Sequence, residues 1–546
     1  MANMNKKRTG FTEDKNTMLN HEGATVHRLN ALEELLNRTM GSYMGESGFY
    51  DKTSPEKDFD RIRELVSQVS PEDAEYVLKI AAIGREVGMI SYPLALLTAC
   101  FNSDMYKGEN FADQNGKNKL CTYSDMIIRR ARDITDILAM QMTCYGFDSV
   151  NGKRTTPIPM QEKKNLKRKL EEMDEYQIAK ALGKSKTVSM ADAIKLLRPA
   201  NKNEFFKQVI EGDVKFANGK KQVQSELTKA NNSNSQSTKA DIKASIADSS
   251  LLAIVKNLVA LVRQDALDEE VTNVIVEKLS NADVVRKSKV MPYELYNAYI
   301  MLSKNSNNRN VVRIKDALIK AIDNSVDNVD AIDGYSVILV DRSGSMRTPV
   351  SQKSTTSCEL MAALLAAIAL KKSYARVFVF ANSCAEVQVS STSTVVDIVE
   401  KILKPSVGGC TYLNQALEFI SKTGDKFENI LVLSDGDAYS YNQRNGLSLG
   451  GGYGDSCDKL VSQLINKGVF KRFFINNLSA RDFTVVNTDD YRKNLVTGFT
   501  ERYIDEINFS ILLQRESADV RRLIDTLFEK YYSNKNKKSQ KAKNKR

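Results

Sequence analysis

The sequence predicts a chain of two parts, an all-α solenoid module followed by an α/β domain with a doubly wound parallel sheet. Apolar residues recur at helical spacing from residue 25 to about residue 326. From residue 334 onward, short apolar runs alternate with helical segments instead. A chain of 546 residues is also longer than a single hydrophobic core usually organises. The hydrophobic content of 42% supports packed cores in both parts.

The expected domain boundaries follow these changes in pattern. Residues 1–24 are polar and are expected to be flexible, and residues 25–330 form the helical module. Residues 331–530 form the α/β domain, and residues 531–546 form a basic disordered tail. Inside the helical module, the stretch from about 218 to 243 is rich in Asn and Ser and has too little apolar area to order itself. A mobile loop is therefore expected there.

The helical module is expected to be a HEAT-like α-solenoid, because its helices come in pairs with short connections. Start signals such as Ser70 before Pro71 support the boundaries, since Ser caps a helix and Pro fits its first turn. The expected helices are 25–39, 59–68, 71–87, 92–102, 124–145, 159–173, 174–182, 189–197, 203–211, 249–262, 269–281, 292–303 and 311–326.

In the α/β domain, the alternation of strands and helices predicts a parallel sheet with helices on both faces. The expected strands lie near 335–341, 376–381, 429–434, 469–475 and 494–499. The expected helices lie near 356–372, 395–403, 412–421, 456–467 and 516–530.

A candidate metal site lies at the carboxyl ends of two expected strands. The apolar run from Tyr335 stops at Asp341 and is followed by two serines, while a second apolar run stops at Asp435. A Gly-Gly-Cys-Thr segment ending at Thr411 lies between them in sequence. The ends of parallel strands meet at one edge of the sheet, so these oxygen-bearing side chains are expected to converge. The candidate ligands are Asp341, Ser343, Ser345, Thr411 and Asp435.

Carboxylates and hydroxyls favour a hard divalent cation, Mg²⁺ first, with Mn²⁺ or Ca²⁺ as alternatives. Such a ligand set leaves a coordination position for a carboxylate or phosphate of a partner. A glycine-rich loop, Gly446–Gly454, follows Asp435 and is expected close to the metal. The competing interpretation is an Asp-Ser-Gly turn whose side chains cap the backbone without binding metal.

Catalysis is not expected. The only histidines are His21 and His27, so the serines have no plausible base. The Gly183-Lys-Ser185 segment fails as a phosphate loop because Ile178 stands where its first glycine is needed. Seven cysteines without a Cys-x-x-Cys pair argue against a zinc ribbon and against a disulfide framework. With no signal sequence and no span long enough for a bilayer, a soluble cytoplasmic protein is expected.

The net charge of +11 is unevenly distributed. Residues 530–546 carry eight Lys or Arg and no acid, and residues 153–202 carry thirteen against six acids. Basic residues gathered on one module suit phosphate binding, although a solvated helix face explains them equally well. The candidate nucleic-acid contacts are Lys163, Lys164, Lys167, Arg168, Lys169, Lys180, Lys184 and Lys186, with Arg129, Arg130 and Arg132 as a second set.

The three-part metal pattern resembles the metal-ion-dependent adhesion site of von Willebrand factor A domains. Together with the helical module, the chain resembles the Ro ribonucleoprotein family, whose helical part is called the TROVE module. The segments that carry the resemblance are Met44–Tyr50, Asp174–Lys180, Ser189–Pro199 and Val285–Tyr293. Two departures stand out: Arg198 precedes Pro199 where the family commonly has His, and the chain has no Trp.

The resemblance implies a ring of helical repeats closed by the A domain. It also implies binding of small non-coding RNA on a basic outer face and of single-stranded ends of misfolded RNA in the central hole. A monomer acting in RNA quality control or ribonucleoprotein assembly would follow. The alternative is a metal-dependent, adhesion-type module that binds a protein carboxylate and has no RNA function.

Overall fold

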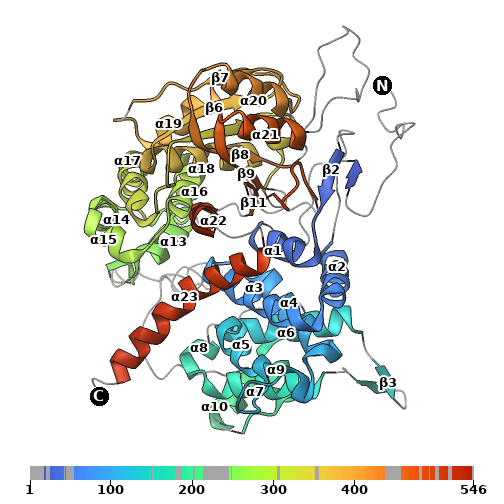
Figure 1. Cartoon of the computed structure of the whole chain (residues 1–546). Coiled ribbons are helices and arrows are strands. Elements are labelled where there is room, and N and C mark those ends of the chain that lie inside the picture. The colour runs from blue at the N-terminus through green and yellow to red at the C-terminus, as the bar shows by residue number, and fades with distance from the viewer. Residues whose placement is uncertain are drawn as a thin grey trace, which may run out of the picture.

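The computed structural model shows a helical module joined to an α/β domain, with a long C-terminal helix running back across the helical module (Figure 1). The structure describes residues 17–19, 25–41, 44, 54–146, 148–150, 153–155, 158–179, 181–182, 187–200, 203–212, 245–247, 249–303, 308–350, 356–390, 392–436, 457–478, 483–490, 492–497, 503–513 and 519–543. The predicted mobile loop at about 218–243 and the glycine-rich loop Gly446–Gly454 lie outside these residues.

The first half of the helical module follows the predicted succession of helices. Local signals set several starts: the Ser54 hydroxyl accepts the backbone N–H of Lys57, and Pro55 occupies the first turn. The helices are α1 (Ala31–Gly41), α2 (Pro55–Gln68), α3 (Ala74–Glu86), α4 (Ser91–Asn102), α5 (Lys119–Ile127), α6 (Ala131–Cys144), α7 (Met160–Glu172), α8 (Glu175–Ala179), α9 (Met190–Leu197) and α10 (Asn203–Glu211).

The second half of the module packs beside the α/β domain (Figure 1). Its helices are α13 (Leu251–Arg263), α14 (Glu269–Ser280), α15 (Ala282–Ser288), α16 (Pro292–Ser303) and α17 (Arg309–Ser325). The short helix α15 was not predicted. Asn281 starts it by accepting the backbone N–H groups of Asp283 and Val284.

Two predictions for the helical module were wrong. The helix expected over 124–145 is divided, because Ile128 is extended and Arg130 and Asp133 form a capping box that starts α6. The helix expected from residue 25 begins at Ala31, since Thr25–Arg28 is strand β2. Strand β2 pairs antiparallel with β1 (Thr17–Leu19), within the terminus expected to be flexible, and with β10 (Phe483–Thr484) of the distant α/β domain.

The α/β domain contains a six-stranded sheet in the order β11-β9-β8-β5-β6-β7. The strands are β5 (Ser336–Asp341), β6 (Ala375–Phe380), β7 (Cys384–Glu386), β8 (Phe427–Ser434), β9 (Phe470–Asn477) and β11 (Lys493–Thr497). Neighbouring strands are parallel except β7, which pairs antiparallel with β6. The sheet is therefore mixed, and the prediction of an all-parallel sheet missed this edge strand.

Helices cover both faces of the sheet. Alternate residues of β5 enter different cores. Ile338 and Val340 face α18 (Cys358–Lys372) and α19 (Val395–Leu403) on one side of the sheet. Val337 faces α20 (Leu413–Ser421) and α21 (Cys457–Asn466) on the other side. The first core also contains residues of α22 (Tyr503–Leu513), a helix that was not predicted, and continues into the helical module. The two modules therefore share one hydrophobic core.

The C-terminal helix α23 (Val520–Lys543) packs against α3 and α22. Arg521 forms two hydrogen bonds with Asp73, at 2.6 and 2.8 Å, and Tyr532 donates its hydroxyl to the backbone carbonyl of Ala82. The boundary predicted at residue 530 lies inside this helix. The helical backbone continues to Lys543, within the segment 531–546 for which a disordered tail is predicted.

All seven cysteines are free thiols. Cys100, Cys358 and Cys457 are buried, and Cys410 is exposed beside Thr411. Among the helices that the structure describes, none combines the length and the apolar character needed to cross a membrane.

Candidate metal centre and nucleic-acid interface

Asp341 is the last residue of β5 and lies fully buried at the carboxyl edge of the sheet. Both of its carboxylate oxygens are held. The backbone N–H of Ser343 donates to Oδ1 at 2.8 Å, and the hydroxyl of Ser434, the last residue of β8, donates to Oδ2 at 2.6 Å. The hydroxyl oxygens of Ser343 and Ser345 lie 3.2 Å apart. Three of the predicted ligands thus form one cluster.

The Gly-Gly-Cys-Thr segment reaches the same edge through backbone contacts. The backbone N–H of Gly344 donates to the carbonyl of Gly409 at 2.8 Å, which joins this segment to the serine loop. Gly408 has φ +99°, and a Cβ atom there would lie 2.4 Å from Oδ1 of Asn382. That side chain accepts the N–H groups of Gly409 and Cys410 at 2.8 and 2.7 Å. Thr411, two residues after Gly409, is 5% exposed.

The electrostatics of the cluster favour a cation. Asp435 is 2% exposed and directly follows β8, the neighbour of β5. Burial first, and then the negative charge of Asp435, raise the pKa of Asp341 to about 7. Arg342, the adjacent basic residue, faces away: it pairs with Glu359 and donates to the backbone carbonyls of Ile402 and Pro405.

The residues present fit a divalent cation. Two buried carboxylates close enough to repel each other are costly unless a positive charge joins them, and the neighbouring hydroxyls supply further oxygen ligands. Asp341, Ser343, Ser345, Thr411 and Asp435 would hold it directly or through water. The described part of the chain holds no group of three His, Cys, Asp or Glu side chains suited to a metal, and this cluster itself combines only two carboxylates with hydroxyls. Metal binding itself stays a prediction.

Sequence reasoning missed two residues that position this cluster. Ser434 was counted only as the end of a strand, although its hydroxyl fixes Asp341. Asn382 was not considered at all, although its amide oxygen holds the Gly-Gly-Cys-Thr segment. A small polar residue directly before Asp435, and an Asn directly after an expected strand, were the available signals.

The predicted basic surface lies partly on α7. Lys163 is half-buried and Lys164 exposed, and neither has an ion pair within the residues that the structure describes. Lys167 lies 4.0 Å from Glu171. Arg168 and Lys169 are instead neutralised by Asp125 and Glu172 at 2.7 to 3.3 Å. Lys180, Lys184 and Lys186 lie outside the described residues.

The second basic set has mainly internal partners. The Arg129 guanidinium contacts Glu86, the carbonyl of Arg85 and the Tyr532 hydroxyl. Arg130 donates twice to Asp133, which also holds the buried Arg85. Only Arg132, whose side chain is 63% exposed and 3.9 Å from Asp136, is largely open to solvent. This set holds α3, α6 and α23 together more than it offers a surface for phosphate.

The fold and the cluster define a class of protein. A family model described as the von Willebrand factor type A domain matches residues 336–437, which contain all five candidate ligands. The chain is thus a helical module that carries a von Willebrand factor A domain. Its overall fold is that of the Ro protein: the crystal structure of Deinococcus radiodurans RO (RSR) protein matches with a TM-score of 0.62. That match is 16% identical in sequence and covers 88% of this chain and 99% of the other.

The resemblance predicted from the sequence is confirmed at the level of the fold. A second solved structure, proximal thread matrix protein 1 from the mussel byssus, is 14% identical. It covers 41% of this chain and 63% of its own, and its TM-score of 0.21 is too low to define a shared fold. A comparison of the sequence with curated proteins finds no match.

Proposed function

We propose that the protein binds RNA as the Ro resemblance implies. It holds a small non-coding RNA on the basic face of the helical module and receives single-stranded ends of misfolded RNA. It then serves RNA quality control or ribonucleoprotein assembly. This is a binding function, and we assign no catalytic residue.

One observation carries the proposal. Lys163 and Lys164 lie in the first two turns of α7, with Lys167 one turn further on. The first two have no acidic partner in the described part of the module, so their positive charge is available to phosphate. Amphipathic packing requires only the apolar residues of α7, such as the buried Leu166 and Leu170, and does not require lysines on the outer face.

The metal centre has a separate part in the proposal. A divalent cation, Mg²⁺ by preference, would supply positive charge at the carboxyl edge of the sheet. Asp341 and Asp435 would carry the compensating charges, and an open position could take a phosphate or a partner's carboxylate. The metal edge is formed by β5, β8 and their loops, whereas the lysines lie on α7, so the two parts can be tested independently.

The test is the salt dependence of RNA affinity. Each lysine that contacts a phosphate releases counterions, so log affinity falls with log salt by roughly 0.7–0.9 per contact. Replacing Lys163, Lys164 and Lys167 by Gln should weaken binding to a hairpin RNA with a single-stranded 3′ end. It should also flatten the salt slope by about 2.

The matched control replaces three exposed lysines of the α/β domain, Lys422, Lys426 and Lys467, by Gln. It removes the same net charge and should leave the slope unchanged. Equal slopes for the wild type and the α7 variant would contradict the proposed surface. Equal losses of RNA affinity in both variants would show a non-specific effect of net charge.

A further inference from the structure

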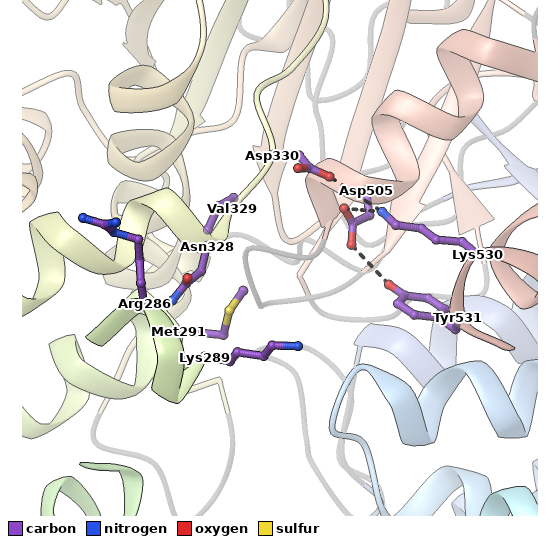
Figure 2. Close-up of a pocket in the computed structure, with 9 residues that line it drawn as sticks. All are labelled: Arg286, Lys289, Met291, Asn328, Val329, Asp330, Asp505, Lys530 and Tyr531. Atoms are coloured by element: carbon purple, nitrogen blue, oxygen red, sulfur yellow. Dashed lines mark hydrogen bonds and ion pairs between the residues drawn. The ribbon is translucent and has the colours of Figure 1, made fainter. Parts of the chain in front are cut away.

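The contacts between the helical module and the α/β domain differ from place to place. Between α15 and the pair of helices α22 and α23, a pocket of about 340 Å³ separates Lys289 from Lys530 and Tyr531 (Figure 2). Helix α16, by contrast, hydrogen bonds directly to the α/β domain, because the Thr356 hydroxyl donates to Oδ1 of Asn297 at 3.1 Å. This direct contact leads to the loop of the candidate metal centre.

The metal loop, residues 341–350, is tied to the first turn of α18 after its second serine. The backbone carbonyl of Ser345 accepts the N–H of Thr348 at 3.1 Å and also accepts the Thr348 hydroxyl. The carbonyl of Thr348 in turn accepts the N–H of Cys358, the first residue of α18, at 2.9 Å. The backbone of one candidate ligand is therefore connected to α18 through a single threonine.

Thr356 lies where the metal loop meets the start of α18. Its carbonyl accepts the N–H of Val350 at 2.9 Å, and Pro349 and Ser357 form an antiparallel bridge. The end of the metal loop and the segment before α18 thus lie side by side. The Thr356 hydroxyl extends from this pair of segments to Asn297 in the helical module.

The side chain of Asn297 is not needed to pack its own helix. Buried Leu295 and Leu302 supply the apolar contacts of α16, and the half-buried position 297 does not require an amide for them. Thr356, in contrast, is only 6% exposed, and a buried hydroxyl is costly without a hydrogen-bond partner. The Asn297 oxygen therefore favours the observed position of Thr356.

We propose that Asn297 is a positioning residue of the metal centre. Through Thr356 it fixes the loop that presents Ser343 and Ser345, so a side chain of the helical module shapes a site in the α/β domain. The inference rests on the divalent cation proposed above. Mg²⁺ demands near-ideal octahedral geometry, whereas Ca²⁺ accepts flexible geometry. Loosening the loop should therefore weaken Mg²⁺ binding more than Ca²⁺ binding.

The experiment titrates the full-length protein with Mg²⁺ and with Ca²⁺ and follows the rise in melting temperature. Thr356→Val removes the donor with little change of shape, and it should weaken Mg²⁺ binding about three- to tenfold, because one hydrogen bond is lost. Ca²⁺ binding should change less than about twofold. Asn297→Ala should show the same selective loss. Thr356→Ser keeps the hydroxyl and should retain the wild-type affinity.

Asn310→Ala is the matched control. Asn310 is also half-buried, and its amide donates to the backbone carbonyl of Leu267 at 2.8 Å, a contact within the helical module. This variant should lower the melting temperature without cation and leave both cation affinities unchanged. A purely structural role of Asn297 would give the same result as Asn310→Ala, and that result in Asn297→Ala would overturn the proposal.

A double variant, Asn297→Ala with Thr356→Val, should lose no more affinity than either single variant, because both changes remove the same hydrogen bond. Additive losses, equal losses of Mg²⁺ and Ca²⁺ affinity, or wild-type affinity in Thr356→Val overturn the positioning role.

Asp341→Asn separates this failure from failure of the metal centre. If its Mg²⁺ response survives, or if the wild type shows no response, the cation site itself is refuted and the positioning role falls with it. If Asp341→Asn abolishes the response while Asn297→Ala and Thr356→Val bind Mg²⁺ as the wild type does, only the positioning role is refuted.

Discussion

Ser434 and Asp341, 93 residues apart in sequence, share a hydrogen bond of 2.6 Å that connects the ends of β8 and β5. The serine hydroxyl is the donor, so it favours the charged form of the carboxylate, against the larger opposing effects of burial and Asp435, and it fixes the plane of the carboxylate. With the backbone of Ser343 on the other oxygen, the carboxylate is oriented before any ligand arrives. Such preorganisation lowers the cost of binding a cation.

The first prediction concerns the cation. Mg²⁺ at saturating concentration should raise the melting temperature of the full-length protein, because a ligand bound only by the folded state stabilises it. Asp341→Asn should abolish this response. Without metal, the same variant should have a stability close to that of the wild type, because it removes the repulsion between Asp341 and Asp435 but also loses one of the two hydrogen bonds that the carboxylate accepts.

The control for that experiment is Asp316→Asn, which neutralises an exposed aspartate on α17. It should respond to Mg²⁺ as the wild type does. A response that survives in Asp341→Asn would place the cation elsewhere and leave this cluster as a capped turn.

The second prediction concerns pH. Glu162 is fully buried in α7, neither carboxyl oxygen has a hydrogen-bond partner in the described structure, and burial raises its pKa to about 8. The unfolded carboxyl titrates near ~4.3. Between these values the folded state retains a proton that the unfolded chain has lost, so the free energy of unfolding falls as pH rises.

Glu162→Gln should remove this decline. The variant should exceed the wild type by roughly 1–3 kcal/mol at pH 9 and differ little at pH 5. Chemical denaturation at both pH values measures the difference. Glu418→Gln, at an exposed position on α20, should show no such dependence. A wild-type advantage at pH 9 would indicate that Glu162 has a partner when ionised.

The third prediction follows from the acidic partner of two candidate RNA contacts. Asp125 lies 2.8 Å from Arg168 and 3.3 Å from Lys169. Asp125→Asn should free part of their charge and tighten RNA binding by about two- to fivefold, since an exposed pair is worth up to ~1 kcal/mol. Filter binding at low salt measures the change. Unchanged affinity would exclude Arg168 and Lys169 from the interface.

The fourth prediction concerns α23. Ile524 and Leu527 of this helix are buried, while Arg521 bonds to Asp73, which caps α3, and Tyr532 bonds to Ala82 of α3. Removing residues 520–546 should destabilise the protein by several kcal/mol, since each buried side chain contributes roughly 1.5–3 kcal/mol.

Removing only residues 533–546 keeps these contacts and should leave the melting temperature nearly unchanged. It should also preserve the preference for RNA with single-stranded ends over duplex DNA. Loss of that preference would attribute RNA binding to the basic end of the chain, and the protein-binding alternative would become the better explanation.

The parts of the fold that depend on local pattern were predictable. Strand β5 was expected at 335–341 and lies at 336–341, and α19 was expected and found at 395–403. Thr25–Arg28 was misassigned because it pairs with Phe483–Thr484, and no local pattern records a partner so far along the chain. The edge strand β7 was missed because its three residues are too short to show an alternation.

The placement of Asp341 and Asp435 at one edge of the sheet was predictable, because a carboxylate occurs at the end of an apolar run in two neighbouring strands, whereas their role as metal ligands stays a prediction. The residues that hold this cluster in place were not predictable. Asn382 acts through its contact with Gly409 and Cys410, and that contact depends on how two loops meet. The ion pairs of the basic residues were equally hidden, because sequence does not show that Asp125 pairs with Arg168.

The contact between Asp73 and Arg521 spans 448 residues, so it can form only late in synthesis of the chain. A ribosome that adds about 5–20 residues per second leaves the outer face of α3 without its partner for roughly 20–90 seconds. During that time the nascent helical module presents an uncovered apolar face to the cell. The helical module therefore cannot complete its packing until the α/β domain and α23 have been synthesised.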